Sequence, residues 1–291
     1  LEVGMGGNLD ATNIIKNTVL AVLVPISMDH QAFLGNTLAE IAQKKAGIIK
    51  PGCSVVTVGQ QPETMEVIRN VCQEKGADLT ETDLNSIKAL KEDFAGQILE
   101  YREETYKISL AGSYQTENAA LALDALEVLN HKGYPTTVEQ RKKGLEETKW
   151  NGRLTIIHRN PLFIVDGAHN PAAADMLEDS VRKYFKGRKM YFIMGVFRDK
   201  DYSYIIRKLC PYAEQIVTIE TPHNPRALPA QELAEAVRAC NPHVQAAENI
   251  QDAVNKVFAM AEREDLILSF GSLSFIGEIT TLVKNREEKN L

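Results

Sequence analysis

The second half of the sequence alternates between short apolar runs and longer segments with helical spacing. The apolar runs predict strands at residues 162–165, 190–194, 215–219, 244–246 and 266–270. The segments between them predict helices near residues 171–185, 201–210, 229–239 and 250–263. Strands that alternate with helices form a mostly parallel sheet covered by helices, because each crossover returns the chain to the same end of the sheet. We therefore expect an α/β fold.

The first half is less regular, and Trp150-Asn151-Gly152-Arg153 marks the change between the two patterns. A chain of 291 residues is long enough for two ordinary domains, which we place at residues 1–149 and 150–291. In the first domain we expect a buried strand at 18–24, further strands at 54–58 and 78–84, a hairpin within 85–110, and helices at 62–76, 119–130 and 137–148.

Composition excludes several classes of function. The net charge of −6 comes from scattered residues, which gives no support for nucleic-acid binding or for a basic membrane-binding face. No apolar run approaches the roughly 20 residues that a membrane-spanning helix needs. The four cysteines lack the paired spacing of a zinc site or a disulfide framework, so we expect reduced thiols and a cytoplasmic protein.

A group of polar residues follows the strand expected at 18–24. The run Ser27-Met28-Asp29-His30 lies just past its carboxyl end, where open α/β sheets bind ligands. Residues 37–40 have the pattern of a capping box, which begins a helix that reaches Lys45. These side chains can converge on one polar site. The alternative is an internally satisfied Asp-His loop, with Lys45 in solvent.

Two other loops have the composition of ligand-binding loops. Gly4, Gly6 and Gly7 permit unusual backbone angles and a close approach of the backbone to a ligand. The run 166–171, Asp-Gly-Ala-His-Asn-Pro, follows the strand expected at 162–165, and Pro171 suits the first turn of the next helix.

Five motifs together resemble the folylpolyglutamate synthase and dihydrofolate synthase family of the Mur-ligase superfamily. In chain order they are EVGMGGNLDATN at 2–13, SMDH at 27–30 with KAGII at 45–49, GSYQTENA at 112–119, WNGR at 150–153, and DGAHNP at 166–171 with PRALP at 225–229 and GSL at 271–273. The resemblance covers nearly the whole chain. It implies part of a P-loop ATPase domain of the Mur-ligase type, followed by a Rossmann-like ligase domain.

The resemblance also implies the reaction. Enzymes of this family use ATP to convert a carboxylate to an acyl phosphate, which the amine of L-glutamate attacks to give an amide and ADP. The implied acceptor is the γ-carboxylate of tetrahydrofolate, with dihydropteroate as a second acceptor. Mg²⁺ is the implied cofactor, because phosphoryl transfer depends on neutralising charge with a hard cation. The implied oligomeric state is a monomer.

Site residues follow from the same resemblance. Glu2 and His30 would bind Mg²⁺, and Lys45, carbamylated in this family, would add a further oxygen ligand. Asp10 would accept hydrogen bonds from the pterin ring of the folate, whereas the residues alone favour an Asx turn equally. His30 and Lys45 also count among the implied catalytic residues, together with His169.

The second domain is expected to contribute most of the remaining groups. Asn118, Arg153 and Asp166 would line the nucleotide site at the domain junction, with the guanidinium of Arg153 on phosphate oxygens. His169 and Ser272 would face the incoming glutamate and the reacting carboxylate. Without the family resemblance, the residues fit a simpler interpretation equally well: His169 would cap a helix and Ser272 would lie in a turn.

Two features depart from the family. Lys44 stands where the family has glutamate, and its ammonium would weaken cation binding if it pointed inward. The family's Gly-Lys-Ser/Thr phosphate loop is expected before Glu2, and the sequence contains none. We therefore expect this chain to be the carboxyl-terminal two thirds of an enzyme and to be inactive alone. The rival interpretations are another Mur-type ligase, for peptidoglycan precursors, and a non-catalytic binding module.

Overall fold

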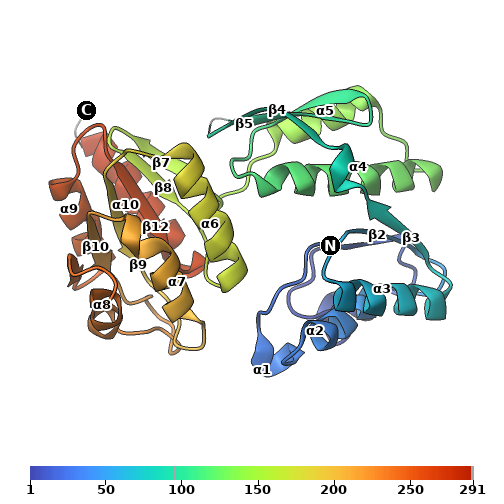
Figure 1. The fold of residues 1–291 in the computed structure, drawn as a ribbon, viewed down its shortest axis with the longest axis horizontal. Coiled ribbons are helices and arrows are strands. Elements are labelled where there is room, and N and C mark those ends of the chain that lie inside the picture. The colour runs from blue at the N-terminus through green and yellow to red at the C-terminus, as the bar shows by residue number, and fades with distance from the viewer. Residues whose placement is uncertain (95, 290–291) are drawn as a thin grey trace. The chain divides into compact units, whose positions relative to one another are not determined.

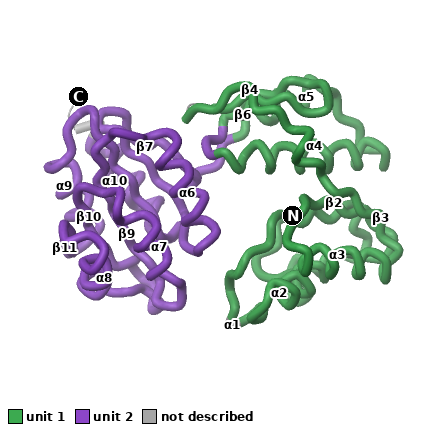
Figure 2. The backbone as a smooth tube through the Cα atoms, viewed as in Figure 1, with its two compact units in different colours: residues 1–109, 113–148 green, residues 110–112, 149–291 purple. Residues whose placement is uncertain are grey.

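The computed structural model describes residues 1–94 and 96–289 (Figure 1). The chain forms two compact units, which are residues 1–109 with 113–148 and residues 110–112 with 149–291 (Figure 2). Each unit has its own sheets and its own hydrophobic core. Within the described ranges, no helix is long and apolar enough to cross a membrane.

The first unit contains a three-stranded parallel sheet in the order β1 (Leu20–Leu23), β2 (Ser54–Val58) and β3 (Asp78–Thr82). Short helices η1 (Ala11–Ile14) and α1 (Gln31–Leu34) flank β1, and α2 (Leu38–Lys45), η2 (Ala46–Ile48) and α3 (Pro62–Lys75) follow. The predicted capping box is confirmed, since Thr37 Oγ1 accepts from Glu40 N while Glu40 bonds back to Thr37 N. Residues from α2 and α3 pack with β1 and β2 to form the core of this part.

The expectation that the first strand is buried was wrong in part. Ala21 and Leu23 of β1 are buried, but Val22 between them is 38% exposed. Among the described residues β1 pairs with β2, with Val22 opposite the fully buried Val56. Ala21 and Leu23 belong to the core formed with α2 and α3, whereas on the other face Leu20 packs against a second cluster that contains Val56, and Val22 is left exposed.

The hairpin expected within 85–110 is a larger structure. After η3 (Leu84–Ser86), strands β4 (Lys88–Asp93), β5 (Gly96–Tyr101) and β6 (Glu104–Ile108) form a three-stranded antiparallel sheet. Strand β4 was not predicted because its first four residues are exposed and none of its six is buried, so it gives little hydrophobic signal. Helices α4 (Tyr114–His131) and α5 (Val138–Glu147) complete the unit.

The second unit is built on a six-stranded sheet in the order β11-β10-β9-β12-β8-β7. The strands are β7 (Thr155–Arg159), β8 (Leu162–Val165), β9 (Met190–Met194), β10 (Gln215–Thr218), β11 (Val244–Ala246) and β12 (Leu266–Phe270). All pairs are parallel except β7 with β8. Strand β7 was not predicted from the sequence; it joins the sheet as an antiparallel edge strand.

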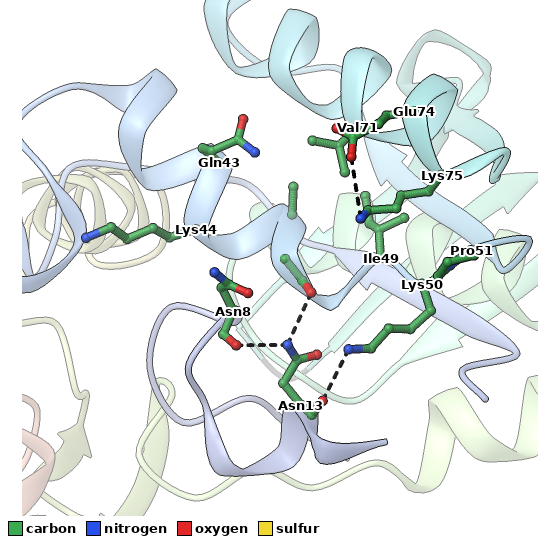
Figure 3. A pocket seen from close by; sticks show the side chains of 12 residues that line it. Asn8, Asn13, Gln43, Lys44, Ile49, Lys50, Pro51, Val71, Glu74 and Lys75 are labelled. Carbon is green, nitrogen blue, oxygen red and sulfur yellow. Dashed lines mark hydrogen bonds and ion pairs between the residues drawn. The ribbon is translucent and has the colours of Figure 1, made fainter. Parts of the chain in front are cut away.

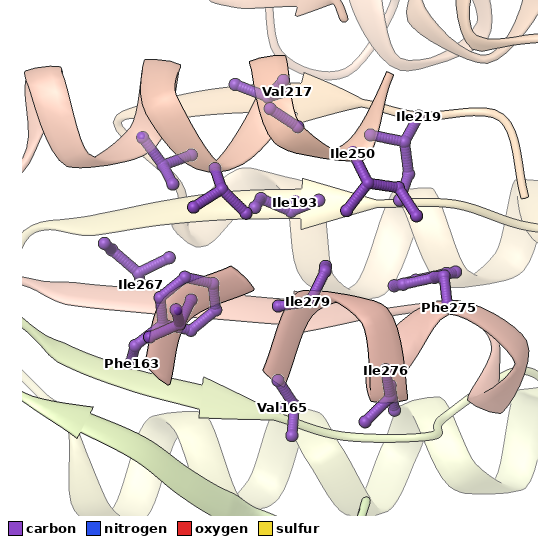
Figure 4. Packing of buried hydrophobic residues seen from close by; sticks show 14 of the residues in the cluster. Phe163, Val165, Ile193, Val217, Ile219, Ile250, Ile267, Phe275, Ile276 and Ile279 are labelled. Atoms are coloured by element: carbon purple, nitrogen blue, oxygen red, sulfur yellow. The ribbon is translucent and has the colours of Figure 1, made fainter. Parts of the chain in front are cut away.

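Helices cover both faces of this sheet. Side chains of α9 (Ile250–Met260) and α10 (Ile276–Lys289) pack on one face against Phe163, Ile193 and Ile267 (Figure 4). Helices α6 (Pro171–Tyr184), α7 (Tyr202–Leu209) and α8 (Ala230–Arg238) lie on the other face (Figure 1). Short helices η4 (Cys210–Tyr212) and η5 (Leu273–Phe275) follow α7 and β12. Helix α10 was also missed from the sequence.

Candidate functional site

The second unit has a topological switch point at the carboxyl edge of its sheet. Strand β12 lies between β8 and β9, although β8 and β9 are consecutive in the sequence. The loops after β8 and β9 lead to α6 and α7 on one face of the sheet, whereas the loop after β12 leads to α10 on the other face, and open α/β sheets bind ligands where neighbouring loops diverge in this way. The loops here are close: a Cβ added to Gly271 after β12 would overlap the carbonyl oxygen of Gly195 after β9.

Asp166 lies directly after β8 and is 5% exposed. Its Oδ2 accepts a hydrogen bond from Leu154 N at 2.9 Å, and its Oδ1 accepts one from Ala168 N at 2.8 Å. Burial raises the pKa of Asp166, against the lowering effect of these two N–H groups and of the nearby Arg153 and His169. The carboxylate is thus part of the scaffold of the loop, while Arg153 is half-buried beside it.

His169 has a defined ring orientation. Its Nδ1 lies 2.8 Å from the carbonyl oxygen of Gly167. A carbonyl oxygen only accepts, so Nδ1 carries the proton and the neutral ring has its lone pair on Nε2. The next residue, Asn170, caps helix α6 by accepting from Ala173 N, and Pro171 is the first residue of that helix as predicted. The loop therefore places an imidazole at the amino end of α6.

Ser272 is at the same edge of the sheet, directly after Gly271. It is 3% exposed, and its Oγ accepts from Ser274 N at 3.2 Å as the cap of η5. This is the geometry of the turn serine that the residues alone allowed. Its predicted contact with glutamate stays a prediction.

Two arginines at this edge were given no role from the sequence, although Arg226 belongs to the PRALP motif at 225–229. Arg198 follows β9 and Arg226 follows β10, and Arg198 N donates to Arg226 O at 2.8 Å. Both guanidinium groups are exposed and paired with carboxylates, Arg198 with Glu232 and Arg226 with Asp199. Their position in the sequence could have indicated them, because each arginine follows a strand of the parallel sheet.

Asp10, in the first unit, organises the glycine-containing loop. Its Oδ1 accepts from Thr12 N at 2.9 Å and from Thr12 Oγ1 at 2.6 Å, and its Oδ2 accepts from Met5 N at 2.9 Å. This is an Asx turn that caps η1, as one of the two sequence interpretations predicted. The predicted contact with a pterin ring stays a prediction. It would use a lone pair of Oδ2 that does not accept from Met5 N.

The hydrogen bonds at Asp10 predict a pH effect. They lower the pKa of its carboxyl from 3.8 to about 2, with the Thr12 hydroxyl as the largest cause. Since the folded pKa lies below the unfolded one, the stabilisation is present above about pH 4 and is lost as the pH falls toward 2. NMR titration of the Asp10 carboxyl should give a midpoint near 2, which Thr12→Val raises. Thr105→Val on β6 is the control, and an unchanged midpoint in Thr12→Val would contradict the assignment.

The predicted residues around His30 and Lys45 also lie in the first unit. His30 precedes α1 in a left-handed conformation, with φ of 51°, and its Nε2 is 3.8 Å from Asp29 Oδ2. Lys45 is half-buried at the end of α2, where Asn8 N donates to Lys44 O at 3.0 Å and a Cβ added to Gly7 would overlap the carbonyl oxygens of Lys44 and Lys45. Glu2 is exposed. The loop of Gly7 thus lies against the end of the helix that carries Lys45.

The structure shows the partner of the Lys44 side chain, which stands where the family has glutamate. Its Nζ donates to the carbonyl oxygen of Phe33 at 2.6 Å, at the end of α1. A cation at the carboxyl end of a helix is favourable, because the last carbonyl groups lack partners within the helix. Lys44 is exposed, so its ammonium faces α1 and solvent.

The predicted Mg²⁺ site can be compared with the metal-ligating side chains that the structure brings together. Among residues 1–94 and 96–289, no three His, Cys, Asp or Glu side chains are grouped as for a metal ion. Mg²⁺ commonly uses only one or two protein carboxylates beside phosphate and water, so an exposed Glu2 carboxylate fits a cation that arrives with a nucleotide. The predicted roles of Glu2, His30 and Lys45 stay predictions.

Asn118 lies one turn into α4 and is exposed. Its Nδ2 donates to Gln115 Oε1 at 3.0 Å, which leaves its amide oxygen available to a ligand. The predicted site residues are thus divided: Glu2, Asp10, His30, Lys45 and Asn118 belong to the first unit, and Arg153, Asp166, His169 and Ser272 to the second.

A cavity of about 380 Å³ in the first unit is separate from the predicted residues (Figure 3). Asn8, Lys50 and Lys75 are among its lining residues, and Lys50 Nζ donates to Asn13 O at 3.2 Å. Lys75 ends α3, where its charge complements the helix carbonyls. The lysines that line the cavity have partners within the protein, since the Nζ of Lys75 lies 3.5 Å from Glu74 Oε1.

Comparison with known proteins identifies the family. Residues 152–273 match the Mur ligase, glutamate ligase domain. The dihydrofolate synthase/folylpolyglutamate synthase of Bacillus subtilis is 32% identical over 290 residues, which is 97% of this chain and 66% of that protein. The folylpolyglutamate synthase of Mycobacterium tuberculosis, complexed with ADP and AMPPCP, superposes with a TM-score of 0.86 at 31% identity, covering 97% of this chain and 67% of that chain. The chain belongs to the folylpolyglutamate synthase family.

The family resemblance and the α/β fold expected from the sequence are both confirmed. A further relative, the folylpolyglutamate synthase of Lacticaseibacillus casei, is 34% identical over 236 residues, or 79% of this chain and 55% of that protein. The chain thus spans between about half and two thirds of the length of these curated relatives.

Proposed function

We propose that this chain belongs to an ATP-dependent ligase that adds L-glutamate to the γ-carboxylate of tetrahydrofolate, and also to dihydropteroate. The observation that carries the proposal is the similarity to a bifunctional synthase over 97% of the chain. In this reaction a carboxylate oxygen attacks the γ-phosphorus of ATP and releases ADP. The glutamate amine then attacks the acyl carbon, phosphate leaves, and the amine loses a proton.

Residues of the second unit supply groups for both steps. The guanidinium of Arg153 can pair with two phosphate oxygens at once, which suits the transfer of a charged phosphoryl group. His169 presents its unprotonated Nε2 because Nδ1 is held by Gly167 O, so it can accept the proton that the glutamate ammonium loses. Ser272 remains the proposed contact of the reacting groups, and Asn118 the proposed nucleotide contact from the first unit.

The first unit would hold the cation and the folate. Glu2, His30 and a carbamylated Lys45 are the proposed Mg²⁺ site, and Mg²⁺ when bound neutralises charge on the transferred phosphate. Carbamylation would replace the ammonium of Lys45 by an anionic oxygen ligand. Asp10 is the proposed partner of the pterin ring. We further propose a cytoplasmic monomer that acts on small molecules.

Ligand-dependent thermal stability tests the function. Binding to the folded state alone raises the melting temperature, so ADP with MgCl₂ and tetrahydrofolate should each raise it, whereas a UDP-muramoyl peptide precursor should not. Arg153→Ala should weaken ADP binding at least roughly tenfold through loss of a charged hydrogen-bond donor. Arg263→Ala is the matched control, since Arg263 is exposed in the segment that precedes β12.

Two results would favour the rivals. A response to the UDP-muramoyl compound in place of folate would indicate a peptidoglycan ligase. A chain that responds to neither nucleotide nor folate would indicate a non-catalytic module.

A further inference from the structure

The side chain of Leu273 lies against two glycines of neighbouring loops. A Cβ added to Gly167 would overlap Leu273 Cδ2 and lie 2.7 Å from Leu273 Cγ, and a Cβ added to Gly152 would lie 3.0 Å from Leu273 Cδ2. The isobutyl group therefore occupies the space that a side chain on Gly167 would need. Leu273 thus joins three motifs of the sequence, which are WNGR at 150–153, DGAHNP at 166–171 and GSL at 271–273.

The reason for a glycine at position 167 is space and not backbone angle. The φ of Gly167 lies outside the left-handed region that favours glycine, whereas Gly152 has φ of +87°. Glycine also has the greatest conformational freedom of all residues, so contacts with other groups must hold this peptide in one orientation. Hydrogen bonds hold the N–H groups of Gly167, on Gly152 O, and of Ala168, on Asp166 Oδ1. Leu273 adds an apolar contact on the side where a Cβ would be.

The backbone of Leu273 is itself anchored to the core. Leu273 is the first residue of η5, whose Phe275 is fully buried in the core cluster (Figure 4). Ser272 caps the same short helix by accepting from Ser274 N at 3.2 Å. The side chain of Leu273 nevertheless stays 49% exposed, so burial of its own surface is incomplete. Its position on the two glycines therefore follows from the anchoring of η5.

The carbonyl oxygen of Gly167 is the group that orients the imidazole of His169. This oxygen lies 2.8 Å from His169 Nδ1, and it can only accept, so the contact keeps the proton on Nδ1. A change in the backbone of Gly167 would turn the oxygen away from the ring and remove the preference for this tautomer. Packing of Leu273 on Gly167 therefore bears on the imidazole, although Leu273 is distant from His169 in the sequence.

We propose that Leu273 is a positioning residue for His169. Its isobutyl group fills the space beside Gly167 and so keeps the carbonyl oxygen of Gly167 on His169 Nδ1. The ring is thereby held with its proton-accepting nitrogen, Nε2, on the opposite side from this contact. The inference rests on the proposed function for the use that the reaction makes of His169.

NMR of the whole chain tests the positioning. The ¹⁵N shifts of the imidazole ring distinguish its two neutral tautomers, and about pH 9 lies above the range in which histidines usually titrate. We expect the Nδ1-protonated form of His169 to predominate in the parent chain. In Leu273→Ala, the ratio of this form to the Nε2-protonated form should fall at least roughly threefold, the change expected when a hydrogen bond is weakened. His169→Gln assigns the signal among the six histidines.

Further variants separate positioning from a general loss of packing. Leu273→Met keeps the volume of the side chain and should keep the tautomer ratio of the parent chain. Met176→Ala is the matched control, because Met176 is 39% exposed and lies on α6, the helix that follows His169. This control should leave the ratio unchanged. Leu273→Val, which has no Cδ atom, serves if Leu273→Ala does not fold.

Gly167→Ala tests the same contact from the other side. In the parent chain the added Cβ overlaps Leu273, so the melting temperature should fall. In the Leu273→Ala background that space is open, and the same substitution should lower the melting temperature by no more than roughly half as much, because residues in contact are not additive. Some loss remains, since the added Cβ would also lie 3.3 Å from Gly152 O.

Three results would overturn the proposal. The first is an unchanged tautomer ratio in Leu273→Ala, and the second is an equal fall of that ratio in Met176→Ala. The third is an equal loss of melting temperature for Gly167→Ala with and without the side chain of Leu273. No ligand enters these measurements, so a chain that binds no ADP would contradict the proposed function while the tautomer ratio still decides whether Leu273 positions His169.

Discussion

Gly271→Ala is expected to destabilise the second unit by about 3 kcal/mol, the sum of a left-handed backbone and an overpacked contact. Gly271 has φ of +112°, and an added Cβ would overlap the carbonyl oxygen of Gly195 and approach Val196 Cγ1 to 3.1 Å. Both obstacles are hard to move, since Gly195 N is bonded to Phe270 O in the neighbouring strand. The melting temperature should fall by roughly 10 °C.

Gly277→Ala is the matched control for this substitution. Gly277 lies in α10, and an added Cβ would meet nothing within 4 Å. Alanine in an open helical position is expected to stabilise by up to about 1 kcal/mol relative to glycine. If the two variants unfold at the same temperature, the close approach of the β9 and β12 loops is not as described.

Asp124→Ala should destabilise the first unit by about 3 kcal/mol, because it leaves buried polar groups without a partner. Asp124 of α4 is 1% exposed, its Oδ2 accepts from Tyr101 Oη at 2.9 Å, and its Oδ1 lies 2.9 Å from Arg102 Nε. Tyr101 is itself 1% exposed, so its hydroxyl would gain no water in exchange. Urea denaturation measures the change.

Two variants separate this buried network from a surface ion pair. Tyr101→Phe removes only the hydroxyl and should cost about 1 kcal/mol, with a non-additive effect in the double variant. Asp78→Ala removes an exposed carboxylate whose partner Lys132 is 3.8 Å away, and it should change stability by less than about 0.5 kcal/mol. A loss in Asp124→Ala no greater than in Asp78→Ala would contradict the network.

Periodicity predicted most of the second unit because its central strands are buried on both faces. Strands β8, β9 and β12 lie where the apolar runs predicted them, as does β11 at one edge of the sheet, and Pro171 begins its helix as expected. The two elements of this unit that were not predicted, β7 and α10, lie outside the central strands. Strand β7 is an edge strand, and α10 contains Gly277 and two threonines, which weaken its helical signal.

The candidate site was predictable in its residues and less so in their roles. Motifs placed Asp166 and His169 at the end of a strand, which the structure confirms. The partners of Asp166 could not be predicted, because Leu154 approaches it through tertiary packing that no local pattern records. Asp10 was left between two roles, and only its bonds to Thr12 and Met5 show that it forms the turn.

The place of β12 in its sheet has a consequence during synthesis on the ribosome. Strand β12 contains residues 266–270, yet it separates β8 from β9, which are made about 75 to 100 residues earlier. Until those last residues emerge, the nascent sheet has a missing central strand, and β8 and β9 have no shared neighbour. Complete folding of this unit must therefore wait until β12 has been synthesised.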